Sequence, residues 1–173
     1  GNLEKNRTEM FVESINHILA IWSGKAPYNL DGKYWKITTR KTHFKEIGQG
    51  QIIMPYQKPH PPIFVTAVAP YSKGISLAAE RGWDPISANF LQPKWVKTHW
   101  PKYIEGCVKG NRVINTANWR VAKSIFVSDD ESTALAYAKG KSGPYYFYYD
   151  SLFKKLKRGG RANLFKTDID MPD

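Results

Sequence analysis

The spacing of apolar side chains predicts a helix near the start of the chain, over residues 7–22. Apolar side chains recur there at intervals of four, three and four residues, at Phe11, Ile15, Ile18 and Trp22. Such intervals place the side chains on one face of a helix and leave the other face polar. We therefore expect an amphipathic helix that buries only one side.

Residues 61–82 hold the pattern around which the rest of the chain is organised. A short, mostly apolar run with β-branched residues follows a proline pair, and it predicts a strand over residues 63–67 that is buried on both faces. A helix is expected to begin at Ser72, because a serine hydroxyl there can accept a hydrogen bond from a free N–H group of the first turn. Gly82 is expected to end this helix.

The later apolar runs predict further strands and helices. The strands are expected at residues 83–88 and 119–127, and the helices at residues 92–109, 133–138 and 145–157. Pro101 should kink the first of these helices or mark its true start. Ser128 and Glu131 match a capping box, in which each side chain satisfies a backbone donor of the other. Strands that alternate with helices in this way favour an α/β fold with a parallel sheet.

Residues 25–56 lack a helical period and contain several glycines and prolines. Two short β-like runs within them, at residues 32–39 and 51–54, predict a small hairpin-like insertion. Long connections of this kind often form a lid or a wall over a pocket. Residues 158–173 are expected to form an irregular tail. A length of 173 residues is enough for one domain with a substantial core, so we expect a single domain over residues 1–173.

The turn between the predicted strand at residues 63–67 and the helix after it has the chemistry of an anion site. At a helix N-terminus, unpaired backbone N–H groups and the positive end of the helix dipole point toward whatever lies above the strand. Ser72 and Lys73 would add a hydroxyl group and a positive charge. The alternative is that Ser72 only caps its helix and Lys73 is solvated. The spacing alone leaves both interpretations open.

Net charge and cysteine content narrow the possible partners and the compartment. The formal net charge of +11 allows an anionic partner, such as nucleic acid or a phosphorylated cofactor. The single cysteine, Cys107, excludes an internal disulfide and favours a reducing, cytoplasmic compartment. It falls on the apolar side of a predicted helix, so we expect a buried, inert thiol. The four histidines show no pair at ligand spacing, and we expect no metal site.

The C-terminal part of the sequence suggests a different function, the binding of single-stranded nucleic acid. Aromatic residues at positions 145–149 adjoin the basic side chains of Lys154, Lys155, Lys157 and Arg158. Stacking rings beside cations suit single strands. The alternative, which we favour, is an amphipathic helix whose rings pack on the protein while its lysines reach outward into solvent.

Three stretches of sequence, in this order, resemble one known family of enzymes. They are Pro55-Tyr56-Gln57-Lys58-Pro59-His60-Pro61-Pro62-Ile63, Ala67-Val68-Ala69-Pro70-Tyr71-Ser72 and Ala78-Ala79-Glu80-Arg81-Gly82. Asp31-Gly32-Lys33-Tyr34-Trp35 and Gly110-Asn111-Arg112 extend the match over nearly the whole chain. The ordered set is similar to the middle of the bacterial luciferase-like, flavin-dependent monooxygenases. It is most similar to the branch of limonene and diketocamphane monooxygenases.

The resemblance implies a (β/α)8 TIM barrel that binds FMN at the carboxyl ends of its strands. By family order, this chain would form a partial barrel, with roughly its fifth to seventh βα units, the preceding helix and the hairpin-like insertion. The family takes reduced flavin from a separate flavin reductase and uses O2 to oxygenate a small apolar ketone, alkene or aldehyde. The positions that match its flavin-phosphate loop are Ala67, Val68, Ala69, Tyr71, Ser72 and Lys73.

One departure from the family concerns length. A complete barrel needs about 250 residues, and this chain lacks the strands that carry the family's catalytic histidine. We therefore assign no catalytic residue and expect a fragment that is inactive alone; the alternative is a flavin-binding protein without turnover. Uncovered strand edges and helix faces also predict self-association as a homo-oligomer.

Overall fold

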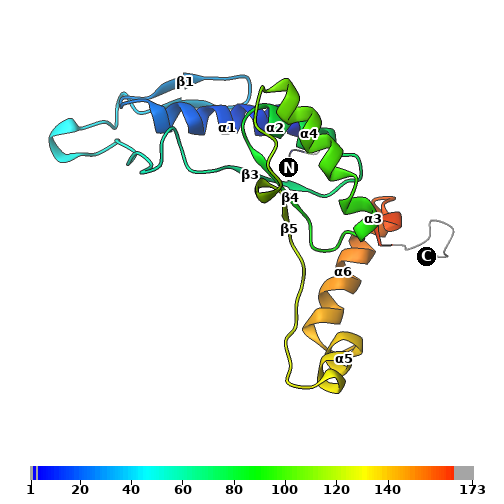
Figure 1. Cartoon of the computed structure of the whole chain (residues 1–173). Helices are drawn as coiled ribbons and strands as arrows, with labels where there is room; N and C mark the ends of the chain where they lie inside the picture. Colours follow the sequence, from blue (N-terminus) through cyan, green and yellow to red (C-terminus); the bar gives the residue numbers. More distant parts are fainter. Residues whose placement is uncertain (1, 3, 166–173) are drawn as a thin grey trace. The chain divides into compact units, whose positions relative to one another are not determined.

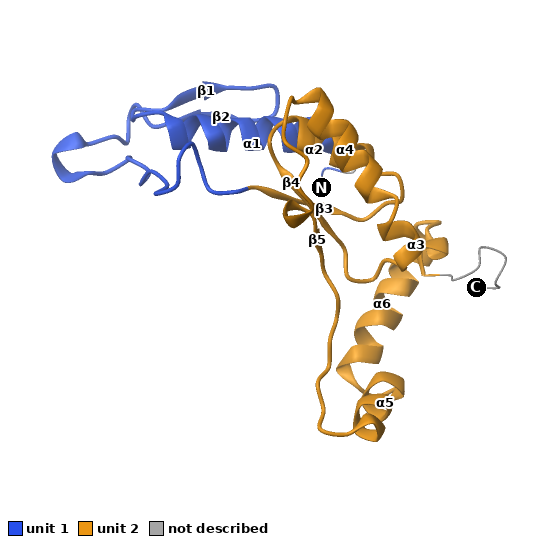
Figure 2. Ribbon diagram, in the orientation of Figure 1, with its two compact units in different colours: residues 1–62 blue, residues 63–173 orange. Residues whose placement is uncertain are grey.

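The computed structural model describes residues 2 and 4–165, and the chain divides into two compact units. Unit 1 comprises residues 1–62 and unit 2 comprises residues 63–173 (Figure 2). Each unit has its own helices and strands (Figure 1). Among the described residues, no helix is both long and apolar enough to span a lipid bilayer.

Unit 1 consists of one long helix and a small hairpin. Helix α1 (Arg7–Ser23) confirms the predicted helix, and the side chain of Asn6 caps its first turn. The expected burial of its apolar face is wrong for Phe11 and Ile18, which are 50% and 41% exposed. The elements that follow are β1 (Asn29–Asp31), β2 (Lys36–Thr38) and the 3-10 helix η1 (Lys45–Ile47). Strands β1 and β2 pair antiparallel, so the insertion does contain a hairpin.

The hairpin pairs different residues from those predicted. Residues 32–39 supply only the turn and β2, whose partner β1 comes directly before that turn, while residues 51–54 form no strand. The Gly32 N–H group donates to the Trp35 carbonyl at 2.9 Å, which closes a tight turn. Because a tight turn joins its immediate flanks, β1 reaches β2 at a lower cost in loop entropy than a more distant segment would.

Unit 2 contains a parallel sheet with helices in its connections. Its strands lie in the order β3 (Phe64–Ala67), β4 (Asp84–Ser87) and β5 (Arg120–Val121), and both pairings are parallel. Its α-helices are α2 (Lys73–Glu80), α3 (Pro93–Val96), α4 (His99–Lys109), α5 (Glu131–Lys139) and α6 (Pro144–Arg158). Its described part also holds the 3-10 helices η2 (Thr116–Asn118) and η3 (Ala162–Leu164). The predicted α/β fold with a parallel sheet is confirmed.

Helices α2 and α4 pack side by side next to β3 and β4 (Figure 1). The cluster that they bury with β3 consists of Ala67, Ile75, Ala79, Tyr103 and Cys107. The two helices approach most closely at Gly106, where an added Cβ atom would lie 2.6 Å from Ala79 Cβ and would also meet the Ser76 carbonyl oxygen. The absence of a side chain at Gly106 therefore permits this crossing. Cys107 is fully buried, as predicted.

A second buried cluster joins the end of α6 to the segment after β4. Its members are Ala88, Leu91, Val96, Leu156 and Leu164. The ring of Phe165 stacks on that of Phe90, with centroids 5.6 Å apart. The start of the segment predicted as an irregular tail thus contains η3 and packs on the unit, whereas residues 166–173 lie outside the described residues.

The prediction that the first strand of the sheet is buried on both faces is wrong. Phe64 is 36% exposed, and Thr66 is exposed as well, whereas Ala67 is 2% exposed. Strand β3 pairs with β4 alone, so one of its edges has no partner among the described residues. Burial of a parallel strand needs cover on both faces and both edges.

The third strand is much shorter than the predicted span of residues 119–127. Strand β4 ends at Ser87, which pairs with Val121 at the end of β5. The Ala122 N–H group still donates to the Ser87 carbonyl at 2.9 Å, and beyond Ala122 the chain forms no further ladder with the described residues. Ile125 and Val127 are accordingly 81% and 85% exposed, although their side chains have strong strand preference.

Two helix predictions also need correction. The expected helix over residues 92–109 is divided into α3 and α4, and Pro101 lies in the first turn of α4, where its missing N–H group costs no hydrogen bond. The predicted capping box is wrong, because Asp130 caps α5 in place of Ser128. Its Oδ1 accepts a hydrogen bond from the Thr133 N–H group at 2.8 Å, and its negative charge suits a helix N-terminus.

Candidate functional site

The six predicted flavin-phosphate residues lie together where β3 passes into α2. Ala67 is the buried last residue of β3. After it come the exposed turn residues Val68, Ala69 and Tyr71, then Ser72 as the N-cap and Lys73 as the first residue of α2. The sequence therefore placed this turn correctly between a parallel strand and a helix.

Tyr71 holds the turn in an unusual backbone conformation. Its φ of 52° lies in the left-handed region of backbone conformation, which residues other than glycine rarely adopt. Its ring is 64% exposed, so ring packing does not account for the conformation. Its N–H group donates to Thr98 Oγ1 at 2.8 Å, and Thr98 Oγ1 donates in turn to the Trp95 carbonyl at 2.6 Å. The junction between α3 and α4 thus holds the backbone of the turn.

The N-terminus of α2 presents several donors without partners. Within the described residues, the N–H groups of Ser72, Lys73 and Gly74 have no acceptor, and the Ser72 side chain makes no capping hydrogen bond. The predicted capping bond of Ser72 is therefore absent. An added Cβ atom at Gly74 would lie 3.4 Å from Ser72 Oγ, so glycine leaves room above the first turn. Adjacent unpaired N–H groups at the positive end of a helix suit an anion.

Lys73 lines a groove of about 240 Å³ between α2 and α4. The other lining residues are Ser76, Leu77, Lys102, Glu105 and Lys109. Glu105 accepts hydrogen bonds from Lys102 Nζ and Lys109 Nζ, each at 2.7 Å, and these bonds lower its pKa to about 2. Glu105 is therefore ionised at neutral pH. Because three lysines and one carboxylate line the groove, its net charge is positive.

A buried row of hydrogen bonds lies under the same turn. His99 Nε2 is 2.9 Å from the Ala69 carbonyl oxygen, and His99 Nδ1 is 2.8 Å from Ser87 Oγ. Ser87 Oγ also accepts from Trp119 Nε1 at 2.9 Å. Sequence analysis did not single out His99, because 30 residues separate it from Ala69 and no motif joins the two. Only the folded chain brings them together.

A further polar cluster follows the carboxyl ends of β4 and β5. Asn89 Nδ2 donates to Ser124 Oγ at 3.0 Å, and the hydroxyl groups of Tyr148 and Tyr149 donate to Asn89 Oδ1 and Ser124 Oγ at 3.2 and 3.1 Å. Ligands of parallel sheets bind at this end of the strands. The cluster lies in unit 2, as does the turn after β3. It is a second set of polar groups at the carboxyl-terminal end of the parallel strands.

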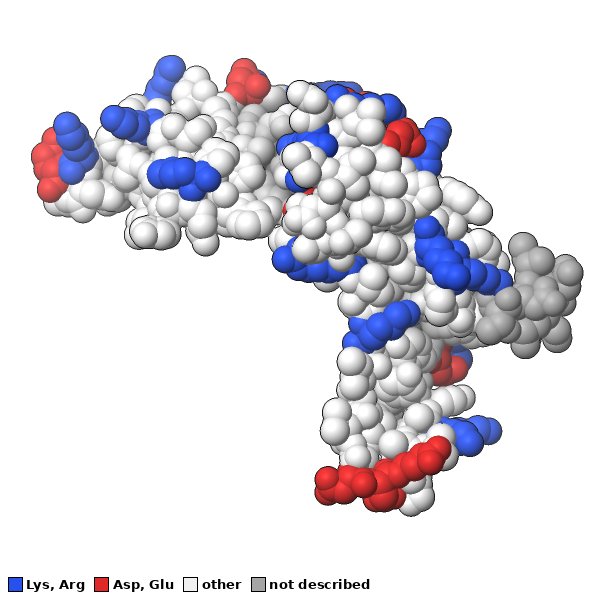
Figure 3. Space-filling model, in the orientation of Figure 1, with Lys and Arg blue, Asp and Glu red and all other residues white. Residues whose placement is uncertain are grey.

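Some aromatic residues of α6 pack on one another and on neighbouring elements, whereas Phe147 is 72% exposed. Tyr145 contacts both Tyr137 and Tyr149, with ring centroids 6.0 and 4.8 Å apart, and Tyr149 meets the edge of Phe165 at 6.4 Å. On the face shown in Figure 3, basic side chains are spread over several elements and do not gather in one patch. These observations support the packing interpretation for Tyr145 and Tyr149.

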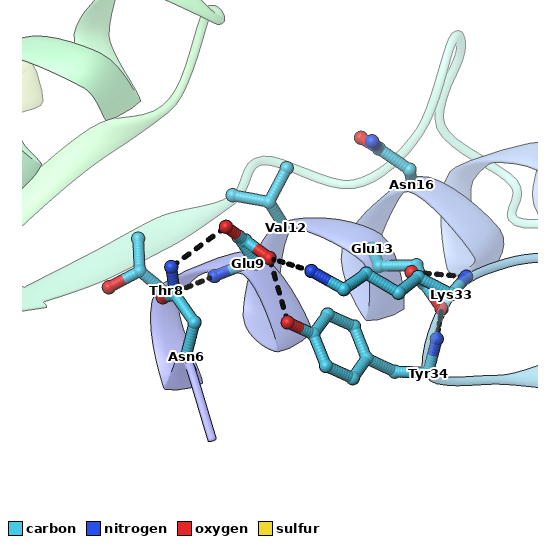
Figure 4. Close-up of a pocket in the computed structure, with 8 residues that line it drawn as sticks. All are labelled: Asn6, Thr8, Glu9, Val12, Glu13, Asn16, Lys33 and Tyr34. Carbon is cyan, nitrogen blue, oxygen red and sulfur yellow. Dashed lines mark hydrogen bonds and ion pairs between the residues drawn. The ribbon is translucent and has the colours of Figure 1, made fainter. Parts of the chain in front are cut away.

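Unit 1 has a pocket of about 440 Å³ between α1 and the hairpin turn (Figure 4). Glu13 accepts hydrogen bonds there from the backbone N–H groups of Lys33, Tyr34 and Trp35, at 2.9, 2.9 and 2.8 Å. Burial alone would raise the pKa of Glu13, but these donors outweigh it and lower the pKa. The carboxylate is thus committed to fastening the hairpin to α1.

Glu9 in the same pocket is committed as well. Its Oε2 accepts from Lys33 Nζ at 2.9 Å and from the Tyr34 hydroxyl at 2.7 Å, and its Oε1 accepts from Asn6 Nδ2 at 2.8 Å. The bond from Lys33 contributes most to lowering the pKa of Glu9. Both carboxylates are therefore ionised at neutral pH and hydrogen-bonded, so neither is suited to act as a general acid. Within residues 2 and 4–165, no three His, Cys, Asp or Glu side chains gather as metal ligands.

Comparison with known proteins gives three findings. No protein-family model matches the chain. The chain is 28% identical over 138 residues to 3,6-diketocamphane 1,6-monooxygenase from Pseudomonas putida, a match that covers 78% of this chain and 36% of the relative. The chain thus spans little more than a third of that relative's length.

Two solved structures share the fold. One is the oxygenating constituent of 3,6-diketocamphane monooxygenase from the CAM plasmid of Pseudomonas putida, described as a type II Baeyer-Villiger monooxygenase in complex with FMN. Its TM-score is 0.73 at 23% identity, over 97% of this chain and 45% of that one. The other is the monooxygenase RslO1 from Streptomyces bottropensis, with a TM-score of 0.57 at 13% identity, over 97% and 44%.

The curated relative and the first structure fall in the branch to which the sequence motifs pointed. The resemblance is therefore confirmed: over most of its length, this chain is similar to part of a luciferase-like, flavin-dependent monooxygenase of the diketocamphane type.

Proposed function

We propose that this chain is part of an FMN-dependent monooxygenase and that the turn between β3 and α2 holds the phosphate of FMN. The observation that carries the proposal is the set of unpaired N–H groups of Ser72, Lys73 and Gly74 at the N-terminus of α2. A phosphate accepts such bonds and gains from the helix dipole. A structure with the same fold is described as a complex with FMN, which supports the choice of anion.

Each proposed binding residue has a specific part. The backbone of Ala67, Val68, Ala69 and Tyr71 shapes the turn, the Ser72 hydroxyl adds one donor and Lys73 adds a positive charge. When bound as reduced flavin, FMN supplies the activation of O2. We assign no residue of this chain to the oxygenation step itself. The names of the relatives support a small apolar ketone as substrate, with alkenes and aldehydes as alternatives.

The architecture that goes with this function is a partial (β/α)8 barrel in a single domain, with roughly the fifth to seventh βα units in this chain. Two observations support it: the parallel order β3-β4-β5 and the helical connections between these strands. Because the matched relatives are more than twice as long, we propose that the chain alone does not oxygenate substrate. We also propose that a separate flavin reductase supplies the reduced FMN and that the protein is located in the cytoplasm.

Titration with FMN tests the binding part of the proposal. Ser72→Ala removes a donor, and Gly74→Ala places a methyl group beside the Ser72 hydroxyl. Each change is expected to weaken FMN binding about tenfold, the scale of one charge-assisted hydrogen bond. Ser142→Ala, at an exposed position, is the matched control and should bind like the unchanged chain. Equal affinity in all four proteins would refute the phosphate site.

A reductase-coupled assay with NADH, FMN and cyclic ketones tests the oxygenation part. The 173-residue chain should give no product, whereas a longer protein that contains it should convert the ketone. Turnover by the chain alone would contradict its proposed inactivity. FMN binding without any turnover by the longer protein would favour the alternative, a flavin-binding protein without catalysis.

Self-association is the remaining part of the proposal. One edge of strand β3 has no partner within residues 2 and 4–165, and the segment after β5 exposes Ile125 and Val127. We propose that a second copy of the chain covers these surfaces when nothing else does. Sedimentation should show oligomers at micromolar concentration. A folded monomer under these conditions would refute the proposal.

A further inference from the structure

The buried row of hydrogen bonds under the turn has one defined direction. The Ala69 carbonyl can only accept, so the bond at 2.9 Å requires a proton on His99 Nε2. The indole of Trp119 can only donate, so its bond at 2.9 Å ends on a lone pair of Ser87 Oγ. Ser87 then donates its own proton to His99 Nδ1 across 2.8 Å. Each hydrogen bond has one defined donor, and His99 is the neutral Nε2–H tautomer.

Burial supports this assignment. His99 and Ser87 are both 0% exposed, so neither can exchange its partner for water. Burial also lowers the pKa of His99, and the bond to the Ala69 carbonyl only partly opposes that shift. The ring of Trp119 is held in place as well, because it stacks on Trp100 with centroids 5.6 Å apart. The row is therefore rigid from the indole to the turn.

His99 acts on the turn together with its neighbour in sequence. Thr98 accepts from the Tyr71 N–H group at 2.8 Å, and His99 donates to the Ala69 carbonyl at 2.9 Å. The two bonds hold the backbone on both sides of Pro70. Tyr71 keeps its left-handed φ of 52° between them. Without this hold, Tyr71 is free to relax, and the three unpaired N–H groups after it would lose their common direction.

We infer that His99 is a positioning residue, which fixes the β3–α2 turn so that the N–H groups of Ser72, Lys73 and Gly74 converge on one phosphoryl group. Ser87 and Trp119 select the tautomer of His99 that can do this. The inference rests on the proposed function for its ligand. The effect of His99 on the turn itself is measurable without any ligand, so the two can fail separately.

The test compares His99→Leu, which is apolar, with His99→Gln, whose side-chain amide can still donate to the Ala69 carbonyl. In the ligand-free chain, His99→Leu should speed hydrogen exchange at the Tyr71 amide, which donates to Thr98 Oγ1, about tenfold, the scale of one buried hydrogen bond. The amides of Tyr103 and Cys107 in α4 should stay protected. His99→Gln should restore most of the protection. FMN affinity should follow the same order.

Nitrogen NMR of the His99 ring in the unchanged chain adds a direct readout. It should show a protonated Nε2 and an unprotonated Nδ1 at neutral pH. The opposite tautomer would overturn the inference, as would an unchanged exchange rate at the Tyr71 amide in a folded His99→Leu variant. If His99→Leu does not fold, Trp119→Phe serves instead, since it removes only the indole donor and should speed exchange at the Tyr71 amide by a smaller factor.

FMN binding separates the inference from the proposed function. Faster exchange in His99→Leu combined with no binding of FMN or inorganic phosphate by the unchanged chain would support the positioning role and refute the phosphate site. Tight FMN binding that is unchanged in a folded His99→Leu variant would support an FMN site and overturn the positioning role.

Discussion

The core around β3 and β4 contrasts with the segment that follows β5. In the core even polar side chains are fully enclosed, since Ser87 and His99 are 0% exposed. After β5 even strongly apolar side chains lie in solvent, with Ile125 81% and Val127 85% exposed. Both regions contain apolar side chains with strand preference, such as Val65 in β3 and Ile125 after β5. The difference shows that burial depends on the neighbouring elements available to a segment, and less on the segment's own hydrophobicity.

The largest expected effect comes from breaking the core at the crossing of α2 and α4. Gly106→Ala would place a methyl group against the Ser76 carbonyl and 2.6 Å from Ala79 Cβ. We expect a loss of about 1–3 kcal/mol in the free energy of unfolding, the usual cost of overpacking. Urea unfolding measures it. Gly159→Ala, where the nearest atom would lie at 3.5 Å, is the control and should change stability little.

The second effect tests the polar part of the core. Ser87→Ala leaves the Trp119 indole N–H group and His99 Nδ1 without their partners. An unsatisfied buried polar group costs about 1–3 kcal/mol, so the variant should unfold at clearly lower urea concentration. Ser124→Ala makes a suitable comparison, because that hydroxyl is exposed. If both variants lost the same free energy of unfolding, burial of the hydrogen-bonded row would contribute nothing to stability.

The third effect is a dependence of core stability on pH. Burial lowers the pKa of His99 below its ordinary value of 6.5, so the unfolded chain binds more protons than the folded chain just below that pH. Stability should therefore fall as pH drops from 6.5 toward the lowered pKa, and be fully present above 6.5. His99→Gln should remove this part of the pH dependence. An identical pH profile in the variant would contradict the account.

The smallest effect is expected in the exposed segment. Val127→Asp places a charge where the side chain is already in solvent, so the free energy of unfolding should change by less than about 0.5 kcal/mol. Self-association, in contrast, should weaken, because the charge would have to be buried at the proposed contact. Sedimentation and urea unfolding on the same sample separate the two. A large loss of stability would show that the segment is packed.

The same contrast explains what could be predicted from the sequence. Periodicity located α1, and the alternation of strands and helices gave the parallel sheet, because both are local patterns. The turn after β3 was also placed correctly, since a strand followed by a serine and a helix is a local signal. The length of β5 was not predictable, because it depends on where β4 ends.

Parts of the candidate site could not be predicted from the sequence either. The bond between His99 and Ala69 spans 30 residues and belongs to no sequence motif. Ser128 and Asp130 both have side chains that can cap a helix. Asp130 caps α5 because the helix begins at Glu131, and the sequence pattern did not fix that starting residue. Long-range contacts and competition between similar neighbours were the two sources of error.

The most direct test of the central claim is a titration of the isotope-labelled chain, followed by amide chemical shifts. FMN should move the resonances of Ser72, Lys73 and Gly74 most, and inorganic phosphate should move the same resonances at higher concentration. Riboflavin, which lacks the phosphate, should leave them in place. Shifts of these amides with riboflavin equal to those with FMN, or FMN shifts confined to other residues, would contradict a phosphate site at the N-terminus of α2.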